Sequence, residues 1–292
     1  MLTIKDLTVN FPSRFGDFTA IKDVNMTIKP GEIHGLVGES GAGKSTVGAA
    51  VIGLLQSPGY VSSGTLTLGD TDLRRLTFAQ AHEIRGSRIS MIFQDPQTSL
   101  NPLMTIEDQL VETIQAHSDA SKTAARKRAV NLLEDIGIKN ASQRIKAYPH
   151  QFSGGMRQRV VIALAICTDP EMIIADEPTT ALDVAVQSQV LDLIQQLAKE
   201  RQIAFMLITH DIGVIAQVAD RVTVMRNGLV METGDTAQVL GAPKHPYTRG
   251  LIDAVPPLDR RIDRFHVPEA DDAAGTQGDT AERWLLEGQH HG

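Results

Sequence analysis

The chain has 292 residues, 42% of them hydrophobic and 22% charged, which is enough to bury a full core in one large or two small domains. A net charge of −7, from 28 basic and 35 acidic side chains, argues against a nucleic-acid partner. The single cysteine, Cys167, can form neither an internal disulfide nor an iron–sulfur cluster, which favours a reducing compartment. Residues 1–11 lack the apolar core of a signal peptide, and no apolar run approaches the roughly 18–20 residues that span a bilayer. We therefore expect a cytosolic chain that serves a membrane only by docking onto another protein.

The first part of the chain is dominated by strand signals. Apolar and polar side chains alternate in the opening segments, as in half-buried strands, and a glycine-rich turn follows the third segment. We expect strands at residues 2–9, 21–28, 32–38, 64–68 and 88–93. Residues 46–55, which come after the glycine-rich turn, predict a helix.

Residues 95–152 have a different pattern. Apolar side chains have helical spacing over residues 106–116 and 122–136, with Ser121 placed as an N-cap and Gly137 as a C-terminal stop. This segment therefore predicts a helical insertion.

The remaining part returns to strands that alternate with helices. Its short, wholly apolar runs are typical of buried parallel strands, and Asn227-Gly228 is a strong hairpin signal. We expect helices at residues 155–166 and 186–200, buried strands at 172–175 and 204–209, and hairpin strands at 222–226 and 229–232. Beyond Pro268 the sequence is polar and acidic, so we expect disorder. The whole pattern predicts an α/β core with a helical insertion and an antiparallel sheet.

A phosphate-loop pattern lies between the strand at residues 32–38 and the helix that follows. Its residues are Gly38, Glu39, Ser40, Gly41, Ala42, Gly43, Lys44 and Ser45, and we add Thr46, the next residue, to the expected nucleotide site. The glycines let successive backbone N–H groups converge on phosphate oxygens. Lys44 can reach the β- and γ-phosphates, and the Ser45 hydroxyl can ligate Mg²⁺. The alternative, a flexible glycine loop, does not explain the strand before it and the helix after it.

Two carboxylates, Asp176 and Glu177, end the apolar strand at residues 172–175. Burying two acids side by side costs several kcal/mol unless a cation or a polarised water compensates. Asp176 suits Mg²⁺, through a water molecule, and Glu177 suits a general base that polarises the attacking water. An acidic pair that merely ends a strand is the alternative, and the phosphate loop in the same chain argues against it.

A serine–glycine turn opens the helix expected at residues 155–166. Its residues are Ser153, Gly154, Gly155 and Met156. With this turn, the phosphate loop and the acidic pair, the chain resembles the ATPases of ATP-binding-cassette (ABC) transporters from about Leu2 to Leu258. The resemblance implies a P-loop NTPase core that binds ATP and Mg²⁺. It also implies that the serine–glycine turn is a second anion cradle, which acts in trans on the ATP held by another protomer.

Further positions match the family one by one. Gln94 corresponds to the glutamine that touches Mg²⁺ and the attacking water, and it leads into the insertion that meets the membrane partner. His210 corresponds to the histidine that contacts the γ-phosphate. Asp183, with Ala181 and Leu182, resembles the loop that couples the two sites across the dimer.

One aromatic side chain near the start of the chain is expected to stack on adenine. Spacing to the strand expected from Ala20 favours Phe15, and Phe11 and Phe18 remain alternatives.

Three segments, at residues 92–96, 98–102 and 245–251, are similar to importers of oligopeptides, dipeptides and nickel. The resemblance implies a two-subunit permease, a second ATPase subunit that is the same chain or a related one, and an external substrate-binding protein. It places the chain peripherally at the cytoplasmic face of the cell (inner) membrane. Peptides are the favoured cargo, with nickel, opines and glutathione-like compounds as alternatives. A soluble ABC ATPase that remodels ribosomes or DNA, and an exporter ATPase, are less favoured.

The resemblance also divides the chain into parts. We expect the ATP-binding core with its antiparallel sheet at residues 1–94, the helical insertion at 95–152, the rest of the core at 153–240, a C-terminal extension at 241–267 and a disordered tail at 268–292. Several members of the group carry a C-terminal cysteine set for an iron–sulfur site, which this sequence lacks, so we expect no cluster.

Overall fold

The computed structural model describes residues 1–180 and 182–254. The expected tail at residues 268–292, the later part of the expected extension and Ala181 lie outside the described residues. Within the described part, no helix is long and apolar enough to cross a membrane.

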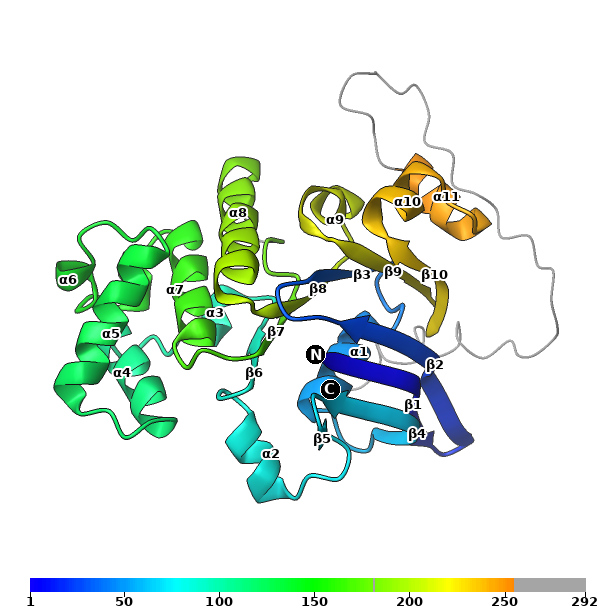
Figure 1. Ribbon diagram of the computed structural model, residues 1–292, viewed down its shortest axis with the longest axis horizontal. Coiled ribbons are helices and arrows are strands. Elements are labelled where there is room, and N and C mark those ends of the chain that lie inside the picture. Colours follow the sequence, from blue (N-terminus) through cyan, green and yellow to red (C-terminus); the bar gives the residue numbers. More distant parts are fainter. Residues whose placement is uncertain (181, 255–292) are drawn as a thin grey trace, which may run out of the picture. The chain divides into compact units, whose positions relative to one another are not determined.

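The strands form two sheets (Figure 1). The strands are β1 (Leu2–Ser13), β2 (Gly16–Ile28), β3 (Ile33–Val37), β4 (Tyr60–Leu68), β5 (Thr71–Asp72), β6 (Ile89–Ile92), β7 (Met172–Asp176), β8 (Ala204–Thr209), β9 (Arg221–Arg226) and β10 (Leu229–Asp235). The antiparallel sheet has the order β2-β1-β4-β5, and the second sheet has the order β10-β9-β3-β8-β7-β6. In the second sheet only β10 runs antiparallel to its neighbour.

The helices lie between and after the strands along the chain. They are α1 (Lys44–Ile52), α2 (Phe78–Ile84), α3 (Pro96–Ser99), α4 (Ile106–Ala116), α5 (Lys122–Asp135), α6 (Ala141–Arg144), the 3₁₀ turn η1 (Pro149–Gln151), α7 (Gly154–Ile166), α8 (Val184–Arg201), α9 (Ile212–Val218), α10 (Thr236–Gly241) and α11 (Pro246–Asp253). Figure 1 shows α4 to α7 as one group of green helices, and α4 and α5 pack on each other and on α7.

The central strands are apolar throughout because both faces of the second sheet are buried. On β7, Ile173 and Ala175 join a core that contains α4, α5, α7 and α8. Met172 and Ile174, which point the other way, join a core that contains α1 and the antiparallel sheet. The side chains of β8 divide in the same way. The prediction of buried parallel strands is therefore confirmed, with the α/β fold as a whole.

The helical insertion is also confirmed. Helix α4 has the predicted bounds, and the Ser121 side chain caps α5 by accepting a hydrogen bond from the backbone of Ala124. Gly137 adopts a left-handed φ of +82° just after α5, as a helix stop requires.

Some boundaries were predicted wrongly. Helix α1 begins at Lys44 rather than at residue 46, because Gly43 takes a left-handed φ of +97° and starts the helix inside the phosphate loop. It ends at Ile52 because Gly53 is again left-handed, with φ +68°. Helix α8 begins at Val184, two residues earlier than expected, because Asp183 is its N-cap.

Candidate active site

The phosphate-loop pattern forms a tight turn between β3 and α1. Gly38, Gly41 and Gly43 all have positive φ, at +156°, +80° and +97°. A Cβ atom on Gly38 would lie 2.1 Å from the carbonyl oxygen of Met225, and one on Gly43 would lie 2.6 Å from Ile21. Only glycine fits these two positions, so the loop is built for a close backbone turn at a helix N-terminus, where N–H groups can bind an anion.

Lys44 points back across this turn. Its Nζ atom donates hydrogen bonds of 2.8 Å to the carbonyl oxygens of Gly38 and Glu39, and the residue is only 6% exposed. Burial lowers the pKa of the ammonium group, and the nearby carboxylates of Glu177 and Asp176 oppose this shift. The loop therefore presents a desolvated cation beside its backbone donors, which suits a phosphate chain.

A hollow of about 330 Å³ opens beside the loop. It is lined by Phe11, Phe18, Ala20, Gly41, Gly43, Lys44, Ser45 and Thr46. Phosphate-binding groups thus share one hollow with aromatic side chains, as a nucleotide requires. Glu39 and Ser40 are exposed, and Ala42 is buried and turns its carbonyl oxygen toward Gly228.

Phe15 does not line this hollow. It is 90% exposed and lies in the turn between β1 and β2, whereas Phe11 and Phe18 are paired across the hairpin beside the loop. The geometry therefore favours Phe11 and Phe18 over Phe15 for the adenine contact, which stays a prediction.

Asp176 lies close enough to the loop for its carboxylate to accept a hydrogen bond from the Ser45 hydroxyl. Burial raises the pKa of Asp176, and the Glu177 charge adds to this, while Ser45 and Lys44 lower it. No cluster of three or more His, Cys, Asp or Glu side chains in the described part of the chain could hold a metal alone. Mg²⁺ needs no such cluster, because it is held by one or two protein oxygens together with water and phosphate. Ser45 and Asp176 fit that requirement.

Glu177 is the centre of a hydrogen-bonded group. Its Oε2 accepts from Gln94 Nε2 at 3.0 Å and from the Thr180 hydroxyl at 2.9 Å, and its Oε1 lies 2.9 Å from His210 Nδ1. Burial on its own raises the pKa of Glu177, but the hydrogen bonds from His210 and Thr180 outweigh it and lower the pKa. The carboxylate is therefore held ionised and oriented. Thr180 was not among the residues singled out from the sequence.

The sheet explains why these side chains meet. Glu177 and His210 come directly after the neighbouring parallel strands β7 and β8, and Gln94 comes two residues after β6, which pairs with β7. The phosphate loop follows β3, next to β8. The carboxyl ends of parallel strands lie at the same edge, where ligands bind in such sheets. The structure thus brings together every predicted catalytic and metal-binding residue.

The serine–glycine turn at residues 153–156 differs from the phosphate loop, because its hydrogen bonds are those of a helix cap. The Ser153 side chain caps α7 by accepting from the Met156 N–H at 3.4 Å, and a Cβ atom on Gly155 would lie 2.3 Å from Val186. Asp183 caps α8 by accepting from the Val186 N–H at 2.9 Å. Ser153 and Gly154 are exposed. Among the described residues, no hydrogen bond or ion pair joins this turn to the phosphate loop.

Comparisons with known proteins agree with this geometry. Residues 21–180 match the ABC transporter family, and residues 231–279 match the C-terminal region of oligopeptide/dipeptide transporters. The dipeptide transport ATP-binding protein DppD of Bacillus subtilis is 47% identical over 89% of this chain and 78% of its own length. The oligopeptide transport ATP-binding protein OppD of the same organism is 46% identical over 89% of this chain and 73% of its own length.

A solved structure extends the match to three dimensions. The ATP-binding cassette MJ0796, a dimer in a post-hydrolysis state bound to ADP and Pi, is 28% identical to this chain with a TM-score of 0.71. The match covers 81% of this chain and 99% of the cassette. Family, relatives and site geometry therefore agree that the chain belongs to the ABC transporter family and is one of its ATP-binding, ATP-hydrolysing subunits.

Proposed function

We propose that this chain energises the uptake of peptides through a membrane permease, as one of two ATPase subunits in the transporter. The main observation in favour of peptides as the cargo is the match of residues 231–279 to the C-terminal region of oligopeptide/dipeptide transporters. Relatives named for dipeptide and oligopeptide transport support it, since they align over nearly nine-tenths of the chain.

The residues around the phosphate loop divide the chemistry between them. The N–H groups of the loop and Lys44 bind the phosphates, while Ser45, Gln94 and Asp176 would hold Mg²⁺, with Asp176 acting through water. Bound there, Mg²⁺ supplies positive charge that offsets the charge developing on the phosphates. Glu177 takes the proton from a water whose oxygen attacks the γ-phosphorus, as the bond to the bridging oxygen breaks. Gln94 orients that water, and His210 contacts the γ-phosphate.

A second ATPase subunit completes the site. Residues 153–156 of one subunit close onto the nucleotide held by the phosphate loop of its partner, and Asp183 links the two sites. The exposure of Ser153 and Gly154 supports this arrangement, because no residue in the described part of the same chain covers them. The solved dimer of a related cassette supports it as well.

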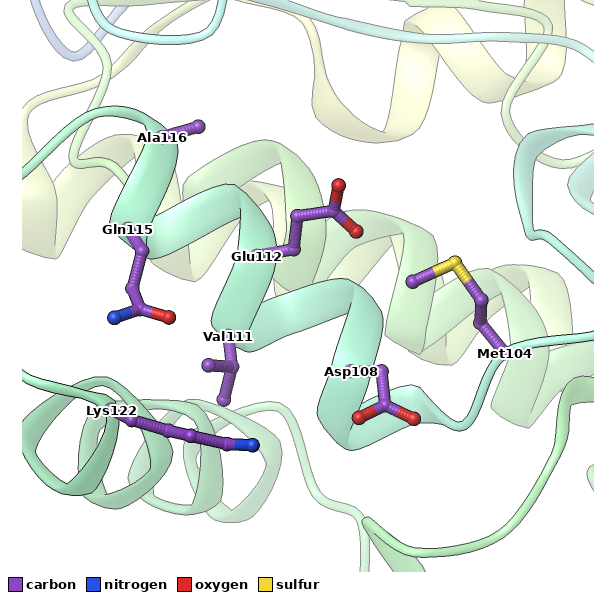
Figure 2. Close-up of a pocket in the computed structure, with 7 residues that line it drawn as sticks. All are labelled: Met104, Asp108, Val111, Glu112, Gln115, Ala116 and Lys122. Atoms are coloured by element: carbon purple, nitrogen blue, oxygen red, sulfur yellow. The ribbon is translucent and has the colours of Figure 1, made fainter.

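The helical insertion is the proposed contact with the permease. A hollow of about 590 Å³ lies beside α4, and Figure 2 shows Asp108 and Glu112 along that helix, with Met104 before it and Lys122 on the neighbouring helix. The acidic side chains of Asp108 and Glu112, together with the flexible apolar side chain of Met104, could bind a short segment of a permease loop that has basic and apolar residues. Through that loop the chain would be held peripherally at the cytoplasmic face of the membrane, with a substrate-binding protein outside.

The cargo can be tested by growth. A strain that lacks this chain and cannot synthesise one amino acid should not grow when a dipeptide is its only source of that amino acid. The wild-type chain should restore growth, and Glu177→Gln should not. The free amino acid, as a control, should support all strains equally. Unchanged growth on dipeptides together with lost nickel accumulation would replace peptides with nickel as the cargo.

A further inference from the structure

The β1–β2 hairpin extends beyond the strand that flanks it. Strand β4 begins at Tyr60, which pairs with Asn10 of β1, and the pairing between β1 and β4 stops at that pair. Residues 11–18 therefore form a two-stranded end, in which Phe11 pairs with Phe18. An isolated two-stranded hairpin is only marginally stable in water, so the position of this end depends on its contacts with the rest of the chain.

One such contact is a hydrogen bond on one face of the sheet. The Tyr60 hydroxyl donates to Asp17 Oδ2 at 2.5 Å, and Asp17 is the β2 residue next to Phe18. Because β1 lies between β4 and β2, this bond spans three strands. A phenol that donates to a carboxylate makes a charge-assisted hydrogen bond, which is stronger than a neutral one. Both side chains are exposed, so water competes for the bond and its contribution is modest.

A second contact lies on the opposite face. Successive side chains of a strand point to opposite faces, so Phe18 lies on the face away from its neighbour Asp17. The ring of Phe11 lies against Gly59, where an added Cβ atom would be 2.5 Å from the Phe11 Cε1 atom. Phe11 and Phe18 both line the hollow beside the phosphate loop. Gly59 and Tyr60 therefore hold the projecting end of the hairpin from both faces.

We propose that Tyr60 is a positioning residue for base recognition. Through Asp17 it holds the end of the β1–β2 hairpin, which places the rings of Phe11 and Phe18 beside the adenine. The physical basis is preorganisation, because a hairpin end already held in its binding position loses less conformational freedom when the base stacks on it. The phosphate loop lies outside this route, so Tyr60 should affect recognition of the base and not of the phosphates. The proposal rests on the prediction that the two rings contact adenine.

Tyr60→Phe in the full-length chain tests the proposal, because it removes the hydroxyl and keeps the ring. The Kd and the KM for ATP should rise about 2- to 4-fold, while kcat stays unchanged. The Kd for inorganic triphosphate, which has no base, should also stay unchanged. A general disturbance of the site would weaken the binding of both ligands. An equal loss for ATP and triphosphate would therefore overturn the proposal, as would unchanged binding of both.

A second pair of variants tests the route through Asp17. Asp17→Ala removes the acceptor and should raise the Kd for ATP by the same factor as Tyr60→Phe. Because the two changes break one bond, the double variant should bind ATP no more weakly than either single variant. Asp17→Asn keeps an oxygen that can accept the bond, so it should retain most of the wild-type affinity. Multiplicative effects of Tyr60→Phe and Asp17→Ala would overturn the proposal.

Tyr148→Phe is the matched control. Tyr148 is 40% exposed and Tyr60 is 41% exposed, and Tyr148 lies in the segment before α7, so its hydroxyl should not affect the Kd for ATP. Phe18→Ala separates the proposal from the prediction on which it rests. If Phe18→Ala weakens ATP binding and Tyr60→Phe does not, only the role of Tyr60 fails. If neither change weakens binding, the adenine contact of the two rings fails with it.

Discussion

Two turns that can bind anions precede helices in this chain, the phosphate loop before α1 and the turn at residues 153–156 before α7. The phosphate loop has partners within its own chain: Lys44 bonds to its carbonyl groups. Asp176 ends β7 and Glu177 follows it, in the same sheet as β3. The second turn has an internal cap from Ser153 but faces solvent at Gly154.

The difference between the two turns agrees with the proposed division of the hydrolytic site between two protomers. The phosphate loop and the residues proposed to hold Mg²⁺ and to activate water lie at one sheet edge of a single chain. The turn at residues 153–156 has the same helix N-terminus and small residues, yet no group among residues 1–180 and 182–254 completes it. We therefore propose that each protomer contributes one nearly complete half-site and one half-site that needs a partner. Substitutions in the two regions should then have different effects.

The largest effect is expected at the first half-site, from Glu177→Gln. The amide keeps the shape of the side chain but cannot accept the proton of the attacking water, so turnover should fall about 10²- to 10⁴-fold while ATP binding persists. Steady-state hydrolysis and ATP titration measure the two quantities. Glu171→Gln is the matched control, since Glu171 lies just before the first residue of β7, at the opposite end of the strand from Glu177, and pairs with Arg88. Normal turnover in Glu177→Gln would reject its role as the base.

The next effect separates binding from chemistry. Lys44→Ala removes two charge-assisted hydrogen bonds and the cation that faces the phosphates, so the Kd for ATP should rise about 10²-fold or more. Equilibrium binding of a fluorescent ATP analogue measures this. Lys199→Ala, which removes an exposed lysine near the end of α8, should leave the Kd unchanged. Tight binding by Lys44→Ala would count against the phosphate-loop assignment.

A smaller effect tests the second half-site. Ser153→Ala should leave ATP binding by the isolated protomer unchanged but lower turnover about 10-fold, because the serine is proposed to act on the nucleotide of the partner. Ser121→Ala is an informative control, since Ser121 caps α5 in the same way. Each substitution removes a helix cap worth about 1 kcal/mol. If both variants lose stability and neither loses turnover, Ser153 is a helix cap and nothing more.

The sequence predicted those strands and helices whose buried residues form a regular apolar pattern. Strands β7 and β8 were found because both of their faces are covered and their residues are apolar throughout. Helix α4 was found with the correct ends because its apolar side chains recur on one face. Helix α2 was missed because it buries none of its residues, so no periodicity marks it.

The sequence also singled out most of the residues that the structure brings together, but not every geometric detail of the site. The phosphate loop and the acidic pair are defined by local patterns. Thr180 was missed because a lone threonine carries no pattern, and its bond to Glu177 depends on how the chain turns after β7. Phe15 was chosen from spacing alone, with the second strand expected from Ala20. Strand β2 instead begins at Gly16, which leaves Phe15 in the turn and brings Phe18 opposite Phe11.

The smallest expected effect follows from that register. Phe18 is 64% exposed and lines the hollow beside the phosphate loop, so it can cover the adenine ring by stacking. Phe18→Ala should raise the KM for ATP about 5-fold, as expected for the loss of an aromatic contact worth about 1 kcal/mol, with kcat unchanged. Phe15→Ala, an equally large truncation in the same hairpin, should leave KM unchanged because its ring lies outside the hollow. The opposite result would restore Phe15 as the adenine contact and require the hairpin to fold over when nucleotide binds.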